Sequence, residues 1–355
     1  MSTSTKKILF ITPKNVAGGA ERVMTSLANS LSLYNDVTFV TMEGKEDFYS
    51  VESRVKRIKL DLPMCQDKRI KKMIQLIPIE IKRIKYIKNI LQSEKPDIVI
   101  SFLFTTNIFT AICSTKDNIP FILSERSDPS QYSFVKKIIM KHYYSKSNGF
   151  VCQSEFMKEY AEKTYNLKNV EVIPNPISKN QYSLDRCDKN NKIISVGRLV
   201  PQKNQKMLIE AFKCVSNKHP DYTLHIFGSG PLKNDLIKLI KDTKMENKIF
   251  INDPQSEVIK NNRDAKIFVL SSDYEGYPNV LVEAMSNGII SISTDFSTKA
   301  ARDIIIDRQN GFLINTNDIS KLSSLLDDIM ENYDNYKYIE KEARKIIDKI
   351  SIEKI

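Results

Sequence analysis

Residues 271–287 read SSDYEGYPNVLVEAMSN, and they stand between two apolar stretches, 266–271 and 288–294, that are typical of buried strands. Gly276 and Pro278 are turn residues, and proline suits the first position of a helix. The apolar face of that helix is formed by Val280, Leu281, Ala284 and Met285. The order strand, loop, helix and strand predicts one unit of a parallel sheet that carries its helix on one face.

Two glutamates flank the predicted junction between loop and helix. Glu275 precedes the turn, and Glu283 is expected about two turns into the helix, on a different face. The backbone N–H groups of Asn279, Val280 and Leu281 are expected to be free at the helix N-terminus, which favours an anion such as a phosphate. Carboxylates for hydroxyl groups and amides for phosphates suit a sugar nucleotide. Either glutamate alone is more often an ordinary surface charge, so the prediction depends on the other motifs.

The composition is that of a folded soluble protein with 41% apolar and 27% charged residues, and 355 residues suit two domains. No run of eighteen apolar residues occurs, so we exclude a membrane-spanning helix, and residues 6–12 are typical of a first strand, not of a signal peptide. The 5 scattered cysteines and 3 histidines have no metal-ligand spacing, which favours reduced thiols in the cytosol. A net charge of +11 indicates an anionic partner, whether nucleic acid, phosphorylated substrate or acidic membrane.

Apolar strands alternate with helical patterns along most of the chain. Further strands are expected at 37–41, 97–102, 121–124, 150–153, 170–173, 192–196, 222–227 and 248–252, and closing helices at 319–333 and 336–350. The alternation predicts an α/β fold with open parallel sheets covered on both faces. The polar residues 177–190 are predicted to link an N-terminal domain, 1–176, to a C-terminal domain, 191–355. Ligands of such sheets bind beyond the carboxyl ends of the strands, which directs attention to the loops there.

Two of these loops are marked by glycines. Gly18 and Gly19 lie between the first strand and its helix, whose start can accept a phosphate or a carboxylate. A tight turn without any ligand explains this pair equally well. Gly228, Gly230 and Leu232 lie in a strand-to-helix loop of the C-terminal domain. A bare GxG pattern is weak by itself, and its value comes from its position at the same edge of the sheet.

Two cations mark another loop of the C-terminal domain. Arg198 and Lys203 lie in a loop that leads from the strand at 192–196 to a helix. A guanidinium fork and an ammonium point charge beside a helix start can clamp a diphosphate. Surface cations without a function are the alternative, which the position of the loop at the carboxyl end of a strand disfavours.

A basic and apolar stretch occupies residues 68–90 and interleaves isoleucine, leucine and methionine with cations. The cations are Lys68, Arg69, Lys71, Lys72, Lys82, Arg83, Lys85 and Lys88. Pro78 is expected to divide or kink the helix. The mixture suits an interface with anionic lipid or a lipid-linked pyrophosphate, and a solvated basic helix face is the alternative. A nucleic-acid groove would need more aromatic residues than Tyr86 alone.

Six motifs in order resemble retaining family 4 glycosyltransferases of the GT-B fold. They are GGAERV at 18–23, SFLFTTN at 101–107, VIPNPI at 172–177, GRLVPQKN at 197–204, FGSGPL at 227–232 and EGYPNVLVEAMSNG at 275–288. The resemblance covers nearly the whole chain, and the last motif combined with the Arg198 and Lys203 pair is specific. Within the family the chain is most similar to bacterial enzymes that add a sugar, often N-acetylgalactosamine, to a lipid-linked oligosaccharide.

The resemblance implies two Rossmann-like domains that face a cleft, with a UDP-sugar donor held mostly by the second. By motif, Arg198 and Lys203 would hold the diphosphate, and Gly19 would present an amide to it. Glu275 with the amides near Asn279 would hold the transferred sugar. Glu283 would bind the ribose, and the loop 227–232 would lie near the uracil. Transfer would retain the anomeric configuration, with no cofactor and no bound metal. An acidic pair, Asp273 and Glu275, is the opposing metal-site interpretation, which we reject because the two cations already supply the charge.

Two departures from the family concern the acceptor and the base. Relatives often carry a histidine in the active-site loop of the first domain, where this chain has Arg126 between Glu125 and Ser127. The acceptor proton is therefore left to Glu125, to Asp128 or to a donor phosphate oxygen. Relatives also tend to have a glycine after the strand near 249–251, where this chain has asparagine and aspartate.

We therefore expect a cytoplasmic enzyme, peripherally associated with the inner face of the plasma membrane. It would transfer a hexose or N-acetylhexosamine from a UDP-sugar to a polyprenyl-diphosphate-linked glycan. The residues named for the acceptor or membrane side are Glu125, Arg126, Asp128 and the cations of the stretch 68–90. A UDP-sugar epimerase or hydrolase on the same fold is one alternative. A basic module that binds lipid or nucleic acid is another, although we expect no nucleic acid partner.

Overall fold

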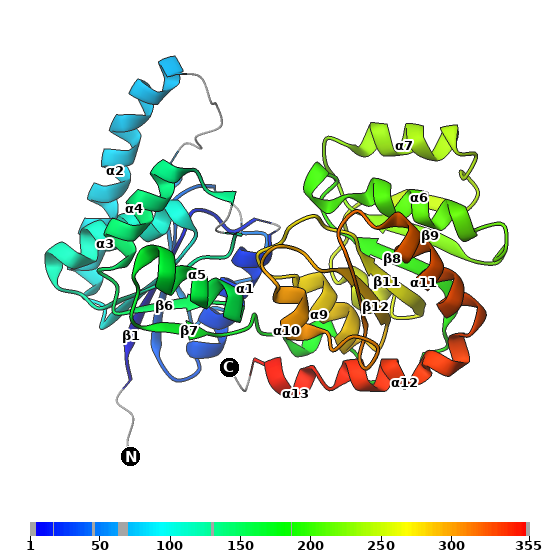
Figure 1. Ribbon diagram of the computed structural model, residues 1–355. Coiled ribbons are helices and arrows are strands. Elements are labelled where there is room, and N and C mark those ends of the chain that lie inside the picture. The colour runs from blue at the N-terminus through cyan, green and yellow to red at the C-terminus, as the bar shows by residue number, and fades with distance from the viewer. Residues whose placement is uncertain are drawn as a thin grey trace. The chain divides into compact units, whose positions relative to one another are not determined.

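The computed structural model describes residues 5–16, 18–44, 47–62, 70–128, 131–185 and 187–352, and in the helix Ile70–Glu94 (α2) it describes side chains from residue 78 onward. The chain forms two compact units, Met1–Pro174 and Asn175–Ile355. Each unit is a parallel sheet with helices on its faces (Figure 1). The predicted α/β class with two parallel sheets is confirmed.

The first unit contains a seven-stranded sheet in the order β3-β2-β1-β4-β5-β6-β7. The strands are β1 (Lys7–Thr12), β2 (Asp36–Thr41), β3 (Lys56–Lys59), β4 (Ile98–Phe102), β5 (Phe121–Ser124), β6 (Gly149–Cys152) and β7 (Val170–Val172). Successive side chains of a strand point to opposite faces. In β1, Leu9 and Ile11 enter one core, and Ile8 and Phe10 enter another. The sheet is therefore buried on both faces.

Helices connect these strands and cover the sheet. They are α1 (Gly19–Leu31), α2, α3 (Phe104–Asp117), α4 (Phe134–Tyr144) and α5 (Glu155–Tyr165). Of the two expectations for Pro78, a division into two helices is wrong, because α2 runs through Pro78 as one helix of 25 residues, and a kink stays a prediction. A proline removes one hydrogen bond of the helix, and Ile87, Ile90 and Leu91 anchor the part that follows in the core.

The second unit contains a six-stranded sheet in the order β10-β9-β8-β11-β12-β13. Its strands are β8 (Asn190–Val196), β9 (Thr223–Phe227), β10 (Ile249–Asn252), β11 (Ala265–Leu270), β12 (Ile290–Thr294) and β13 (Phe312–Ile314). Its helices are α6 (Gln205–Val215), α7 (Lys233–Asp242), α8 (Val258–Asn261), α9 (Asn279–Ser286), α10 (Ala300–Ile304), α11 (Ile319–Glu331), α12 (Tyr333–Arg344) and α13 (Ile347–Ile350). Phe212 of α6 packs on one face of the sheet, and Met285 of α9 on the other.

The residues expected to link the domains are packed within the second unit. Ile177 forms an isolated bridge with Ser351. The Asn287 side chain accepts a hydrogen bond from the Ser183 amide (3.1 Å) and donates one to the Gln181 carbonyl (2.9 Å). The ammonium of Lys189 donates to three backbone carbonyls at 2.8 to 3.1 Å. These contacts hold the start of the unit against the body of its own sheet.

Each predicted strand is present within two residues of its expected ends, and two further strands were not predicted. β3 reads KRIK, whose three cations hide its strand character. β13 has only 3 residues. Both lie at an edge of their sheet, where short or charged strands are common.

Candidate active site

The loops that follow β8 and β11 meet at the carboxyl edge of the second sheet, because these two strands are paired neighbours. The Asp273 amide donates to the Gln202 carbonyl (2.9 Å), and the Gln202 side chain donates to the Tyr274 carbonyl (2.7 Å). The Ser271 hydroxyl donates to the Lys203 carbonyl (2.9 Å). Segments about seventy residues apart in the sequence are thereby joined into one structure.

An ion pair between Lys203 and Glu275 forms the centre of this structure. The ammonium contacts Oε1 of Glu275, and the two side chains are only 15% and 9% exposed. The same oxygen accepts a hydrogen bond from the Ser272 hydroxyl (2.6 Å), and the Glu275 carbonyl accepts one from Thr298 (2.8 Å). The carboxylate is therefore held from several sides, and Lys203 is oriented by it.

Arg198 stands in the same loop with an exposed side chain. Its guanidinium lies 3.5 Å from the side-chain oxygen of Gln202, whose nitrogen lies 3.5 Å from Oε2 of Glu275. The backbone of Arg198 is fixed by the Gln205 side chain, which donates to its carbonyl (2.9 Å). One loop thus presents an exposed guanidinium close to a buried ammonium and carboxylate pair.

The start of α9 differs from the prediction in two respects. Pro278 is the N-cap residue, so the helix begins at Asn279, and Glu283 lies one turn into the helix, not two. The amide of Asn279 donates to the Tyr277 carbonyl (3.1 Å), and that of Leu281 to the Pro278 carbonyl (3.0 Å). The prediction of three free amides is wrong for these two, because the tight turn before the helix supplies acceptors.

Within the described part of the chain, Val280 alone of the three predicted residues keeps an amide without an acceptor. Glu283 is 7% exposed on the buried side of α9. The helix start is further fixed by Asn175, whose side-chain amide donates to Oδ1 of Asn279 (2.7 Å). The start of α9 thus lies at the same edge of the sheet as the Lys203 pair, because the loop that carries Glu275 leads from β11 into this helix.

The glycine loop after β9 crosses the Arg198 loop at van der Waals contact. A methyl group on Gly228 would collide with the carbonyl of Gly197, and one on Gly230 would collide with the backbone of Leu199. The Leu199 amide donates to the Ser229 carbonyl (2.8 Å), and its carbonyl accepts from the Leu232 amide (3.1 Å). The glycines are therefore needed for a close backbone crossing whether or not a ligand binds there.

Asp273, the other carboxylate of the rejected metal-site interpretation, accepts a hydrogen bond from the Asn204 side chain (2.9 Å). In the described ranges, the His, Cys, Asp and Glu side chains form no group of three that could hold a metal ion.

In the first unit, the glycine turn after β1 begins α1. Gly18 is its N-cap residue, and Gly19 is its first residue. A methyl group on Gly18 would collide with the carboxylate of Glu21, which is 9% exposed. The helix start that was expected to receive a phosphate or a carboxylate therefore has a carboxylate of the chain itself beside it.

A buried polar network surrounds Glu125, which follows β5 and is 1% exposed. Its carboxylate accepts hydrogen bonds from the Tyr144 hydroxyl (3.1 Å) and from the amides of Arg126 (3.0 Å) and Ser127 (3.3 Å). Burial raises the pKa of Glu125, while hydrogen bonds from Tyr132, Tyr144 and the amides act in the opposite direction. This setting suits a carboxylate that fixes the loop, and its predicted part in taking the acceptor proton stays a prediction.

The network continues into the motif SFLFTTN. Asn107 donates to the Tyr144 hydroxyl (3.1 Å) and to the Ser124 carbonyl (3.0 Å), and it accepts from the Ser101 hydroxyl (2.9 Å). Ser101 and Asn107 belong to the motif 101–107, but no role was predicted for either of them or for Tyr144. The family-like motif was the available signal for the first two, whereas Tyr144 lies in α4, for which no motif was predicted.

Arg126 and Asp128 occupy the same loop. The guanidinium of Arg126 stacks over the ring of Phe102, 4.0 Å from its centre. With its amide oriented to satisfy both neighbours, Gln153 accepts from Arg126 (3.2 Å) and donates to the Glu125 carbonyl (2.9 Å). Asp128 is 4% exposed. The loop therefore places a fixed cation at the carboxyl edge of the first sheet.

Only some of the cations that were predicted to form a basic surface on α2 are exposed. Lys82 and Lys85 are exposed, but Arg83 is 2% exposed, so its place on an exposed cationic face is a wrong prediction. Arg83 pairs with Glu43 (2.5 Å) and Glu80 (3.0 Å), and it joins α2 to the loop after β2. Lys68 and Arg69 lie outside the described residues, as do the side chains of Lys71 and Lys72.

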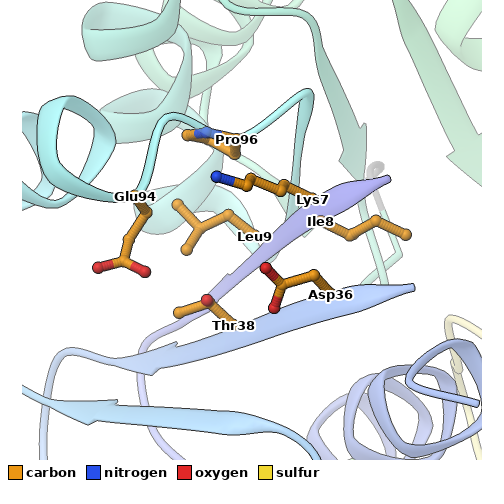
Figure 2. Close-up of a pocket in the computed structure, with 7 residues that line it drawn as sticks. All are labelled: Lys7, Ile8, Leu9, Asp36, Thr38, Glu94 and Pro96. Atoms are coloured by element: carbon orange, nitrogen blue, oxygen red, sulfur yellow. The ribbon is translucent and has the colours of Figure 1, made fainter. Parts of the chain in front are cut away.

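A small cavity lies at the opposite, amino edge of the first sheet. Figure 2 shows the side chains around it, from the first residues of β1 and β2 and from the end of α2. Its volume of about 20 Å³ has room for one water molecule. This cavity is therefore too small for a sugar nucleotide, and it lies at the edge of the sheet opposite to the candidate site.

Two family models match adjoining parts of the chain. Residues 17–181 match the model described as Glycosyltransferase Family 4, and residues 176–346 match the model described as Glycosyl transferases group 1. Together the two models match residues 17–346. The chain belongs to the family 4 and group 1 glycosyltransferases. The enzyme class predicted from the motifs is therefore confirmed, and this glycosyltransferase acts in glycan biosynthesis.

Two curated relatives of this glycosyltransferase come from Campylobacter jejuni. One is GalNAc-α-(1→4)-GalNAc-α-(1→3)-diNAcBac-PP-undecaprenol α-1,4-N-acetyl-D-galactosaminyltransferase, which is 28% identical over 93% of this chain and 90% of its own length. The other is N-acetylgalactosamine-N,N'-diacetylbacillosaminyl-diphospho-undecaprenol 4-α-N-acetylgalactosaminyltransferase, which is 26% identical over 95% of this chain and 94% of its own length. Both names describe transfer to a lipid-linked acceptor.

Solved structures share the fold of this glycosyltransferase. Anabaena HepE in complex with UDP superposes with a TM-score of 0.76 at 17% identity, covering 97% of this chain and 95% of the other. Sucrose-phosphate synthase from Thermosynechococcus elongatus gives a TM-score of 0.83 at 14% identity, covering 97% and 94%. At these identities the likeness concerns the fold, and it confirms the predicted GT-B architecture.

Proposed function

We propose that this glycosyltransferase moves a hexose or an N-acetylhexosamine from a UDP-sugar to a polyprenyl-diphosphate-linked glycan, with retention of configuration and without a bound metal. The observation that carries the proposal is the Lys203–Glu275 pair beside the exposed Arg198. The two Campylobacter relatives, whose acceptors are diphosphate-linked lipids, support the choice of acceptor.

The reaction needs positive charge beside the diphosphate, because the departing UDP develops negative charge there. The guanidinium of Arg198 is exposed and can form two parallel hydrogen bonds to phosphate oxygens. Lys203 adds an ammonium from the same loop, oriented by Glu275. Fixed cations of this kind stabilise the leaving group without reorganising during the reaction, which is the part that a metal ion plays in other enzymes.

Glu275 has a further use in this proposal. A carboxylate that keeps one oxygen on Lys203 and Ser272 can accept hydroxyl hydrogen bonds of the transferred sugar with the other. Glu283, one turn into α9, would accept those of the ribose. The Val280 amide faces the same helix start and can donate to a phosphate.

The acceptor side is proposed for the first unit. The loop of Glu125, Arg126 and Asp128 lies at the carboxyl edge of its sheet, and α2 presents exposed Lys82 and Lys85. As part of the same proposal, the protein works at the inner face of the plasma membrane. The structure has no helix, among the residues it describes, that is long and apolar enough to cross a bilayer.

The test is UDP release from a panel of UDP-hexoses and UDP-N-acetylhexosamines in buffer with EDTA, with and without extracted polyprenyl-diphosphate glycans. We expect release only when both substrates are present, and loss of release in Lys203→Met. Lys206→Met is the matched control, because the Lys206 side chain is 68% exposed. Release without acceptor would indicate a hydrolase on the same fold, and no release in any combination would refute the proposal.

A further inference from the structure

Three large apolar side chains are exposed together at the start of α4. Phe134 is 78% exposed, Val135 64% and Ile138 53%. Single exposed apolar residues are common on protein surfaces, but a contiguous group marks an interaction site. We call these three residues the apolar tip of α4.

The opposite face of α4 already supplies the contacts that hold the helix to its unit. Met140 and Tyr144 are fully buried in the core there. Residues three and four positions apart share a helix face, so Ile138 lies one turn below Phe134 and beside Val135. The apolar tip is therefore a second apolar face, and packing within the first unit does not account for it.

The charged side chains of α4 itself are all positive. The sequence of α4 is FVKKIIMKHYY, which contains Lys136, Lys137 and Lys141 and no acid. Lys136 and Lys141 are exposed. The ammonium of Lys136 lies 5.1 Å and 5.2 Å from the ring centres of Phe104 and Tyr132, which keeps it beside the tip. A helix that exposes apolar side chains and whose own charges are all positive suits an anionic bilayer surface, where apolar side chains insert between headgroups and lysines contact phosphates.

The place of α4 in the fold connects this surface to the candidate acceptor loop. Tyr132 precedes the helix and Tyr144 ends it, and both hydroxyls hydrogen-bond to the carboxylate of Glu125. Figure 1 shows α4 beside α3 in the first unit, and α3 in turn packs against α2. A bilayer that holds the tip of α4 would therefore hold the Glu125 loop close to the lipid headgroups.

We infer that the apolar tip of α4, with Lys136, Lys137 and Lys141, is a docking surface for an anionic lipid bilayer. The inference rests on the proposed function in one respect, since a lipid-linked acceptor explains why such a surface adjoins the acceptor loop. It is separate from the basic stretch of α2, and it names the residues that enter the bilayer.

The test is sedimentation of the full chain with vesicles of phosphatidylcholine alone and of phosphatidylcholine mixed with phosphatidylglycerol. We expect wild type to bind the anionic vesicles. We expect Phe134→Ser/Ile138→Ser to bind them at least about tenfold more weakly than wild type. The control is Leu33→Ser/Tyr34→Ser, which changes residues that are 54% and 78% exposed in the same unit. It should bind as wild type does. Lys136→Gln/Lys141→Gln should lose the preference for anionic over neutral vesicles.

Binding of the tip variant equal to that of wild type would overturn the inference, as would failure of wild type to bind any vesicle. A concentration-dependent dimer that the tip variant abolishes, without vesicle binding, would replace the bilayer by a second copy of the chain. All variants change exposed side chains, so an unchanged melting temperature checks their folding. Because sedimentation needs no turnover, vesicle binding without any transfer activity would refute the proposed function and leave this surface standing.

Discussion

The carboxylate of Glu275 is only 9% exposed and is paired with Lys203. Replacing Lys203 by methionine removes this cation and leaves the carboxylate with fewer hydrogen-bond donors. Loss of one partner of a buried ion pair costs about 3–5 kcal/mol. The Ser272 hydroxyl remains on the same oxygen, so we expect the unfolding free energy of the second unit to fall by about 2–3 kcal/mol. The melting temperature of that unit should fall by about 4–12 °C.

The assay is thermal unfolding followed by circular dichroism, for Lys203→Met, Glu275→Gln and the double variant. If the two side chains act as a pair, the double variant loses less stability than the two single variants added together, with a coupling of about 1–3 kcal/mol. Lys206→Met should change stability by less than about 0.5 kcal/mol, since its side chain is 68% exposed and its partner Glu210 is 3.8 Å away. Additive losses within about 0.5 kcal/mol would refute the reasoning.

Three further predictions concern stability in the rest of the molecule. Burial raises the pKa of Glu125 above its ordinary value of 4.5, so the folded state binds its proton more tightly, and the unfolding free energy should fall as the pH rises from 4.5 through the raised pKa. Glu125→Gln should flatten that part of a denaturation series measured at several pH values. Gly228→Ala forces a methyl group into a backbone carbonyl, so the free energy of unfolding in urea should fall by more than about 3 kcal/mol. Gly149→Ala is the control, because the nearest atom to its methyl group would be 3.6 Å away, and it should lower the free energy of unfolding by about 1 kcal/mol or less. Arg83→Met leaves a carboxylate buried and should cost about 3 kcal/mol in the same assay, and the exposed Lys82→Met should be close to neutral.

The sequence was informative about the sheets because their strands are apolar on both faces. Strands such as β11, AKIFVL, are buried at nearly every position and stand out as apolar runs between turn residues. β3 escaped prediction because an edge strand need not be apolar, and its residues KRIK resemble a loop. Pattern reasoning works where burial decides the residue type and fails where solvent faces the strand.

Candidate site residues were recognisable as types, but their partners were not. Lys203 and Glu275 were both named, yet their mutual contact depends on β8 and β11 being neighbours, which no local pattern encodes. Arg83 looked like one cation among many until the fold brought Glu43 to it from 40 positions earlier. Gly228 is explained by the carbonyl of Gly197, a contact that only the crossing of two loops creates.

The most direct test of the central claim, a donor diphosphate held by cations of the chain itself, is the affinity for UDP measured by titration calorimetry in EDTA. Arg198→Gln suits this test, since Arg198 is exposed and its loss should leave the fold intact. We predict that wild type binds UDP without divalent metal and that Arg198→Gln binds about 10 to 100 times more weakly. The control Lys206→Gln should bind as wild type does. Equal affinity of Arg198→Gln and wild type, or UDP binding that needs added metal, would contradict the account.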